Sequence, residues 1–357
     1  MKQKIQTLCR QQLTAYPALE LTDLVKALYQ AEFGGGHLIQ DPERAKAWLA
    51  EEMTGCARPA SGHCSPQSEQ LGAFSRVHLL PAREMGMPAD TLFSLFMRSA
   101  REPAGDMAAF QAQLDCLQDM AAAHELPLVP EAVAAYLTSY RAQGCPAARH
   151  SEAFRAAYAP AYRVIRSAFV PFLPLFAAID RLLTHGQPVT VAIEGGSASG
   201  KTTLGKLLSE VYGCTVFHMD DFFLRPHQRT PERFAQPGGN VDYERFHHEV
   251  LTPLRRREPF SYRPFSCRTM SLGEPVRVTP TPLCIIEGAY SMHPALAEEY
   301  DLSAFLQIPP DAQAERILQR NGAEMSQRFL QEWIPLEEQY FSACHVKERC
   351  TMVIPVG

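Results

Sequence analysis

The chain has 357 residues, which is too long for one modest hydrophobic core and favours two domains. Apolar residues make up 46% and charged residues 20%, a balance typical of globular proteins. The formal net charge of −5 argues against a general nucleic-acid or membrane-surface partner, because both need a basic face.

The cysteines and the apolar segments indicate a cellular location. Ten cysteines occur without a C-x-x-C pair, which is typical of a reducing compartment. The first residues, MKQKIQTLCR, lack the apolar run of a signal peptide. The longest apolar run, 168–179, contains two prolines and is too short to span a bilayer. These features predict a cytoplasmic protein with no membrane partner.

Residues 1–170 are predicted to form a mostly α-helical domain. Apolar residues within 21–28 recur at helical spacing, and alanine-rich stretches follow at 107–123 and 131–142. A linker helix is expected over 171–186, because Gly186 is a typical helix stop. This half of the chain resembles no family that we can name.

Polar residues that are unusual for a helical domain are concentrated in this first half. If they converge, they form a basic pocket for a phosphate or a carboxylate, and the glycines at 34–36 would let backbone N–H groups approach the anion. The pattern favours the alternative, a helix C-cap followed by ordinary hydrogen bonds between helices. The residues concerned are His37, Arg76, His78, His150 and Arg163.

From residue 187 onward the sequence changes character. Short β-rich segments alternate with amphipathic helical stretches such as 201–212 and 311–320. This alternation predicts βαβ units and a parallel sheet with helices on both faces. We therefore expect a second domain, of the α/β class, over 187–357.

Residues 195–202 read GGSASGKT and match the phosphate-loop pattern G-x-x-x-x-G-K-[ST] at every required position. An apolar strand pattern precedes the motif and a helix pattern follows it. Lys201 would reach the β- and γ-phosphates of ATP, and the Thr202 hydroxyl would bind Mg²⁺. The predicted nucleotide-binding residues are Gly195, Gly196, Ser197, Ala198, Ser199, Gly200, Lys201, Thr202 and Thr203.

Acidic residues follow two of the predicted strands. Glu287 ends the apolar segment 282–286, beside the phosphate site of a parallel sheet, and is predicted to bind Mg²⁺ or its water. Asp220 and Asp221 end the segment that begins at 214. We predict Asp220 to be the catalytic base, with Lys201 as its catalytic partner, and Asp221 to join the metal site. The alternatives are a surface carboxylate at a strand end and an acidic loop that caps a helix.

The order of these motifs resembles the uridine kinase/phosphoribulokinase family of P-loop kinases. The matching features are strand–GGSASGKTT–helix, then MDDFF, then N-x-D, then IIEG. Residues 347–357 resemble that family's final strand. The resemblance covers about 187–357 and implies a doubly wound, five-stranded parallel sheet, ATP and Mg²⁺ as cofactors, and an acidic base in the position of Asp220.

The resemblance also implies an acceptor site. Nucleoside kinases of the family hold ribose hydroxyls with the aspartate of an N-F-D motif, and Asp242 stands in that place. Tyr262 and Arg268 stand where such kinases have an acceptor-binding Y-D-F…H-x-R segment. Arg263 replaces the aspartate of that segment here, so the acceptor is left open among a nucleoside, a sugar or sugar phosphate, and a pantothenate-like alcohol.

A lid is implied after the fourth strand. Arg316 and Arg320 are spaced i, i+4 and lie on one helix face, where lid arginines would offset charge on the transferred phosphoryl group. Solvated helix surface is the alternative. Trp333, Glu337 and Tyr340 are expected to be packing residues.

The sequence therefore predicts an ATP-dependent kinase that phosphorylates a hydroxyl group of a small molecule, with no nucleic-acid partner. It leaves open whether the protein forms a homo-oligomer. Guanine-nucleotide switches carry N-K-x-D, which is absent from the sequence. The alternative function is a nucleotide-dependent sensor or regulator, in which ATP binding controls the helical first half.

Overall fold

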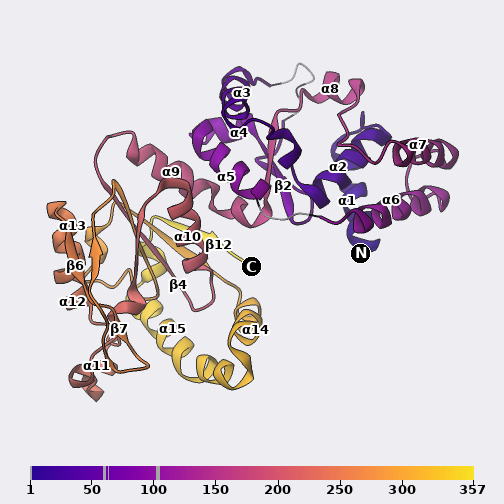
Figure 1. The fold of residues 1–357 in the computed structure, drawn as a ribbon. Coiled ribbons are helices and arrows are strands. Elements are labelled where there is room, and N and C mark those ends of the chain that lie inside the picture. The colour runs from indigo at the N-terminus through magenta and orange to yellow at the C-terminus, as the bar shows by residue number, and fades with distance from the viewer. Residues whose placement is uncertain (1, 59–61, 63, 102–104) are drawn as a thin grey trace. The chain divides into compact units, whose positions relative to one another are not determined.

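The computed structural model describes residues 2–58, 62, 64–101 and 105–357 (Figure 1). Contacts divide the chain into two compact units, Met1–Ala177 and Ala178–Gly357. Each unit has a hydrophobic core of its own. No helix among the described residues has both the length and the apolar character needed to cross a bilayer.

The first unit is mostly helical, as predicted. Its core is formed by the apolar faces of α1, α2, α6 and α7 around Phe110, which is fully buried. Local signals set helix starts: the Asp41 carboxylate accepts hydrogen bonds from the first backbone N–H groups of α3. The helices are α1 (Lys2–Ala15), α2 (Leu21–Phe33), η1 (Gly36–Leu38), α3 (Pro42–Gly55), α4 (Leu79–Glu84), α5 (Ala89–Arg101), α6 (Met107–Ala122), α7 (Pro130–Ala142) and α8 (Glu152–Tyr158).

This unit also contains a three-stranded antiparallel sheet that the helical prediction did not include. The strands are β1 (Ser68–Gln70), β2 (Phe74–His78) and β3 (Tyr162–Arg166), in the order β1-β2-β3. All five residues of β2 are buried, so its sequence lacks the alternation that marks a half-exposed strand. Its partner β3 lies far away in sequence, which leaves no local signal for the pairing.

The second unit is built on the five-stranded parallel sheet that the sequence predicted. The strand order is β12-β11-β4-β10-β5, and every pairing is parallel. Helix α10 (Lys201–Tyr212) packs against β4, β5 and β10. The strands are β4 (Val189–Gly195), β5 (Thr215–His218), β10 (Leu283–Glu287), β11 (Leu302–Gln307) and β12 (Met352–Pro355).

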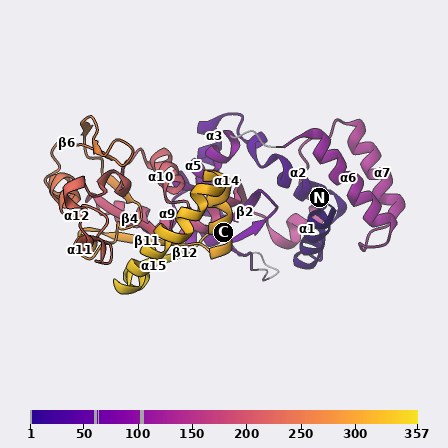
Figure 2. The ribbon, with the colours of Figure 1, turned by 90° about the horizontal axis from the view of Figure 1, so that it is seen from below.

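Helices and two small hairpins surround this sheet. Near the C-terminus, α14 (Pro310–Arg328), η7 (Phe329–Trp333) and α15 (Ile334–Ala343) follow one another, as the gold helices of Figure 2 show. Gly322 interrupts α14 with φ 77° and ψ 173°. The first unit also contains η2 (Ser167–Phe172), which packs on β2 and β3, and α9 (Leu173–Leu183) crosses the boundary between the units. The other elements of the second unit are η3 (Met219–Phe222), η4 (Pro226–Gln228), α11 (Pro231–Phe234), α12 (Tyr243–Phe246), η5 (His247–Leu251), α13 (Thr252–Arg256), η6 (Ala297–Glu299), α16 (Val346–Arg349) and the paired strands β6 (Phe260–Tyr262) with β9 (Val276–Val278) and β7 (Phe265–Ser266) with β8 (Ser271–Leu272).

The register of the central strands determines where the site forms. Glu287, the last residue of β10, lies opposite Ile193 on β4 and His218 on β5. The carboxyl ends of three parallel strands therefore meet at one edge of the sheet. The loops that follow these strands bring together the glycine-rich motif and the predicted acidic residues.

Candidate active site

The glycine-rich segment forms a tight loop between β4 and α10. Gly195 has φ 145°, and a Cβ at this position would lie 2.6 Å from the carbonyl oxygen of Leu306. Gly200 has φ 99° and precedes the first turn of α10. The Lys201 ammonium folds back over the loop and donates hydrogen bonds to the carbonyl oxygens of Gly195 (2.8 Å) and Gly196 (3.0 Å). The loop thus has the strand–loop–helix geometry that phosphate binding requires.

Three side chains meet at the end of β10. The Thr202 hydroxyl donates a hydrogen bond to Glu287 Oε1 at 3.0 Å, and His218 Nδ1 lies 2.5 Å from the same oxygen. Glu287 is buried, and its hydrogen bond raises the pKa of His218 above the usual value. A hydroxyl and a carboxylate are hard oxygen donors of the kind that Mg²⁺ prefers.

This pair fits a magnesium ion that is shared with a nucleotide. Within the ranges that the structure describes, no group of three or more His, Cys, Asp or Glu side chains could hold a metal ion. Mg²⁺ commonly binds one or two protein oxygens and completes its shell with substrate phosphates and water. Thr202 and Glu287 supply two such oxygens next to the phosphate loop.

The two aspartates after β5 differ in their surroundings. Asp220 is exposed, yet partial loss of solvation raises its pKa. The negative charges of Glu287 and Asp221 raise this pKa further, whereas the positive charge of Lys201 lowers it. Asp221 is half-buried and accepts a hydrogen bond from the Tyr262 hydroxyl at 3.1 Å. Desolvation also raises the pKa of Asp221, although the Tyr262 hydrogen bond opposes the rise.

Of the residues predicted to bind the acceptor, Tyr262 contacts Asp221 directly, and Asp242 pairs with Arg245, which also contacts Asp221. The Asp242 side chain is 2% exposed and lies 3.5 Å from the guanidinium group of Arg225 and 3.6 Å from that of Arg245. It also caps α12 by accepting the backbone N–H of Arg245. Arg245 and Tyr262 both hydrogen-bond to Asp221, through its carbonyl and its carboxylate respectively.

The third predicted acceptor residue and the predicted lid residues are arranged differently. Arg268 lies exposed in the turn between β7 and β8, apart from the hydrogen bonds around Asp221. Arg316 points to the loop and donates to the carbonyl of Ala198 at 3.4 Å. Arg320 instead hydrogen-bonds to Asn321 and lies over the ring of Phe329. The roles assigned to these residues remain predictions.

Glu337, which was expected to be a packing residue, binds the phosphate loop. Its carboxylate accepts the backbone N–H of Ser197 at 2.8 Å and the Ser197 hydroxyl at 2.6 Å. Gln313, on α14, donates to the carbonyl of the same serine at 2.8 Å. An acid and an amide on amphipathic helices resemble surface residues in a sequence, so no pattern signals these contacts.

Glu194, the residue before the loop, was also missed. It is fully buried, and its carboxylate accepts the backbone N–H groups of Gly195 (2.9 Å), Tyr290 (3.2 Å) and Met292 (3.0 Å). The Tyr340 hydroxyl donates a fourth hydrogen bond. Burial raises the pKa of Glu194 to about 7, and the hydrogen bonds oppose that rise. A single buried acid inside an apolar strand was the only available signal.

In the first unit, two of the predicted basic residues share one carboxylate. Arg76 and His78 both contact Glu69, at 3.2 Å and 2.6 Å. Tyr16 donates a further hydrogen bond to Glu69, and these partners lower the pKa of Glu69 to about 2 against the effect of its burial. Glu69 is therefore shared inside the protein by Arg76, His78 and Tyr16.

His150 joins Arg76 and His78 around the ring of Tyr162, whereas Arg163 and His37 make separate contacts. His150 hydrogen-bonds to Asp23 at 2.7 Å and to the Tyr162 hydroxyl at 2.6 Å. Arg163 pairs with Glu52 at 2.8 Å. His37 packs edge-on against a tyrosine ring. Arg76, His78 and His150 therefore meet around Tyr162, and the carboxylates of Glu69 and Asp23 pair with them there. This pairing agrees with internal hydrogen bonds, and a basic pocket for an anion stays a prediction.

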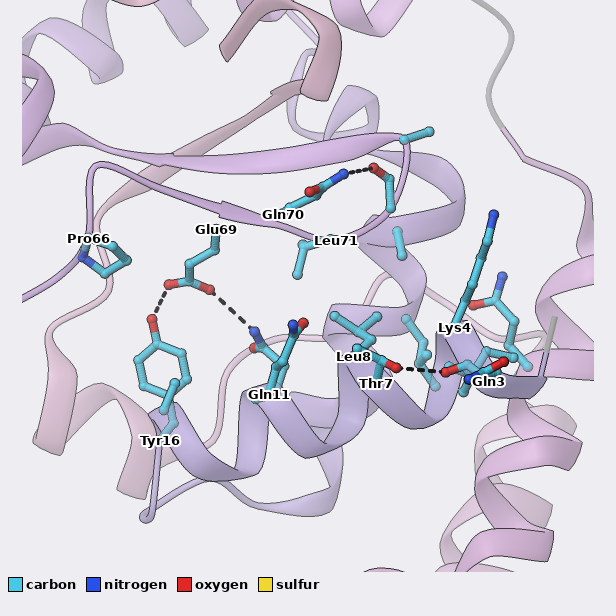
Figure 3. Close-up of a pocket in the computed structure, with 18 of the residues that line it drawn as sticks. Gln3, Lys4, Thr7, Leu8, Gln11, Tyr16, Pro66, Glu69, Gln70 and Leu71 are labelled. Carbon is cyan, nitrogen blue, oxygen red and sulfur yellow. Dashed lines mark hydrogen bonds between the residues drawn. The ribbon is translucent and has the colours of Figure 1, made fainter. Parts of the chain in front are cut away.

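An open pocket of about 1080 Å³ lies beside Glu69 (Figure 3). Its walls carry amide and hydroxyl groups of α1, and Tyr16 and Glu69 meet at one end. Both Glu69 oxygens already have hydrogen-bond partners within the protein. The pocket therefore presents mainly neutral side chains, and we assign no function to it.

Comparison with known proteins gives distant structural matches. No protein-family model matches the chain, and no curated protein does. A possible uridine kinase from Bacillus stearothermophilus is 20% identical over 50% of this chain and 98% of its own, with a TM-score of 0.38. A D-glycerate 3-kinase from Cryptococcus neoformans is 16% identical over 43% of this chain and 79% of its own, with a TM-score of 0.31.

A shikimate kinase from Acinetobacter baumannii in complex with shikimate is 18% identical over 48% of this chain and 84% of its own, with a TM-score of 0.27. All three carry the name kinase. Each of these matches covers about half of this chain. The resemblance is distant, and the fold of the second unit is established by its own strand order and loop geometry.

Proposed function

We propose that the second unit is an ATP-dependent phosphotransferase that moves the γ-phosphoryl group to a hydroxyl of a small molecule. The observation that carries the proposal is the hydrogen bond between Thr202 and Glu287, which joins the phosphate loop to the acids at the strand ends. A loop that binds phosphates and an adjacent acidic edge are the parts that phosphoryl transfer needs.

The nucleotide would be held mainly through its phosphates. The backbone N–H groups of the loop and the first turn of α10 supply donors and partial positive charge. Lys201 would leave the carbonyls of Gly195 and Gly196 for the β- and γ-phosphates. Thr202 and Glu287 would hold Mg²⁺, which neutralises charge on the phosphate oxygens when it is bound.

The transfer step would use Asp220 as the base. The acceptor oxygen attacks the γ-phosphorus, its proton passes to the Asp220 carboxylate, and the bond from the γ-phosphorus to the bridging oxygen breaks to release ADP. The raised pKa of Asp220 suits this role, because a base is most effective when its pKa lies nearer the working pH. Lys201 would offset charge on the transferred group.

The acceptor would bind on the side of Asp221. Tyr262 and Arg245 already hold Asp221 in place, so its position beside the base is defined before any ligand arrives. Asp242 is engaged by Arg225 and Arg245, and a sugar hydroxyl would have to share its carboxylate with them.

A phosphorylation screen tests this proposal. Protein, Mg²⁺ and isotopically labelled ATP would be incubated with a panel of nucleosides, sugars, sugar phosphates and related alcohols, and products would be read by mass spectrometry. We expect a labelled product that depends on both the acceptor and Lys201. ATP hydrolysis at one slow rate with and without every compound would contradict the proposal and favour the nucleotide-dependent regulator.

A further inference from the structure

Ser197, the third residue of the phosphate loop, is held from two helices at once. Glu337 on α15 accepts its backbone N–H and its hydroxyl, while Gln313 on α14 donates to its carbonyl oxygen. The hydrogen-bonding groups of Ser197 are thus engaged by side chains that lie 140 and 116 residues further along the chain. The loop and the segment after β11 are directly connected.

The Glu337 carboxylate occupies a position suited to an anion. Glu337 is 5% exposed, and its two oxygens face an N–H and an O–H of a loop whose donors are arranged for phosphate. The positive charge of Lys201 favours the ionised form of this carboxylate, and the negative charge of Asp220 disfavours it. A carboxylate with two donors at 2.6–2.8 Å has the geometry of a bound ligand.

We propose that Glu337 is an internal ligand of the phosphate loop: its carboxylate occupies the donors of Ser197 in the nucleotide-free protein, and a nucleotide polyphosphate takes its place and releases α15 from the loop. This inference rests on the proposed function only in requiring that the loop binds polyphosphate. It does not depend on which acceptor is phosphorylated.

Electrostatic repulsion explains why a bound polyphosphate would displace the Glu337 carboxylate. Two anions held close together in a poorly solvated site repel strongly, so the polyphosphate and the Glu337 carboxylate compete for the loop and for Lys201. The chain has a place to bend, because Gly322 lies between Gln313 and Glu337 with φ 77°, and a Cβ there would meet no atom within 4 Å. The helix before Gly322 can keep its contact while α15 moves.

Nucleotide affinity is the first test. Glu337→Gln keeps an acceptor for Ser197 but removes the competing charge, and we expect it to bind Mg²⁺-ATP and inorganic tripolyphosphate about tenfold more tightly, as for one charge-assisted hydrogen bond. Glu338→Gln is the matched control, since Glu338 is exposed on the same helix. That control should bind as the wild type does.

Movement of α15 is the second test. Trp333 lies four residues before Glu337, and the chain has two tryptophans, so Trp48→Phe leaves Trp333 as the only indole. Adding Mg²⁺-ATP should shift the Trp333 emission in this background. In the Trp48→Phe/Glu337→Gln protein the same shift should occur at about tenfold lower Mg²⁺-ATP, because the acceptor for Ser197 remains but the competing charge is gone.

The outcomes separate this inference from the proposed function. If wild type binds polyphosphate but Glu337→Gln binds it equally or more weakly, the carboxylate only braces the loop, and the inference fails while the kinase proposal stands. If neither protein binds polyphosphate in the presence of Mg²⁺, the proposed function fails and the inference fails with it. Melting temperatures of both variants would show that each is folded.

Discussion

The hydroxyl of Tyr340 donates a hydrogen bond to the carboxylate of Glu194 at 3.1 Å, and both side chains are fully buried. Glu194 directly precedes the phosphate loop, whereas Tyr340 lies on α15, one turn after Glu337. The same helix therefore contacts the loop at its entrance, through Glu194, and at its third residue, through Ser197. A substitution that breaks one of these two contacts should therefore also weaken the other, because both belong to one helix.

Glu194 should make the stability of the second unit depend on pH. Burial raises its pKa from an ordinary 4.5 to about 7, so its contribution is complete below pH 4.5 and is lost as the pH rises through 7. The full change corresponds to about 3 kcal/mol of unfolding free energy. Glu194→Gln is neutral at every pH and should flatten the curve in this window.

Urea unfolding between pH 4.5 and 8 measures this effect. Trp333 emission in a Trp48→Phe background reports on the second unit. Asp220 and Glu337 also have raised pKa values, so the contribution of Glu194 is the difference between the wild-type and variant curves. Parallel curves would contradict the prediction. Glu338→Gln, on the exposed face of α15, should leave the curve unchanged.

Lys201→Ala and Asp220→Asn should both severely impair phosphoryl transfer, for different reasons. Lys201→Ala removes a phosphate-binding charge and should greatly weaken ATP binding. Asp220→Asn removes the proton acceptor and should lower kcat by about 10²- to 10⁴-fold while ATP affinity stays near that of the wild type. Calorimetric ATP titration and steady-state kinetics separate the two effects, and near-normal turnover by Asp220→Asn would refute the base assignment.

Glu287→Gln should change the magnesium requirement. The amide oxygen can still accept the Thr202 hydrogen bond, but the lost charge should raise the Mg²⁺ concentration for half-maximal activity by about tenfold, since hard cations bind charged oxygens more tightly. Magnesium titrations of kcat measure this shift. Glu298→Gln, which alters a 91% exposed carboxylate, is the control and should titrate like the wild type. An unchanged requirement in Glu287→Gln would place the metal elsewhere.

Arg76→Met should destabilise the first unit strongly. Arg76 is 1% exposed, and its removal leaves the Glu69 carboxylate in the interior without its main counter-charge. Breaking such a pair costs about 3–5 kcal/mol of unfolding free energy. Trp48 emission during urea unfolding, in a Trp333→Phe background, would measure the loss.

The double variant Arg76→Met/Glu69→Gln provides the control for this pair. It should recover part of the lost stability, because neither partner then leaves an isolated charge. The pKa of Glu69, lowered to about 2, implies a second check: its contribution is present above pH 4.5 and is lost as the pH falls toward 2. A loss below about 1 kcal/mol for Arg76→Met would show that the pair is not a stabilising contact.

The parallel sheet and the phosphate loop could be predicted because their signals are local. Each strand of the second unit is a short apolar run, and all five residues of β10 are buried. The loop needs its glycines, lysine and threonine in consecutive positions, so the motif is complete in the sequence. The strands of the first unit were missed because β1 and β2 are short and β3 is distant along the chain.

The amino-acid order alone was sufficient to predict the phosphate loop, the five-stranded sheet and the acids that end its strands. The loop motif and the acids are recognised from neighbouring residues, and the sheet is recognised from its short apolar segments. The folded chain was needed for the partners of these groups: Glu337 at Ser197, Tyr340 at Glu194 and the arginines around Asp242. Hydrogen bonds and ion pairs act over a few ångströms in space and carry no preferred separation along the chain, so such contacts leave no pattern to read.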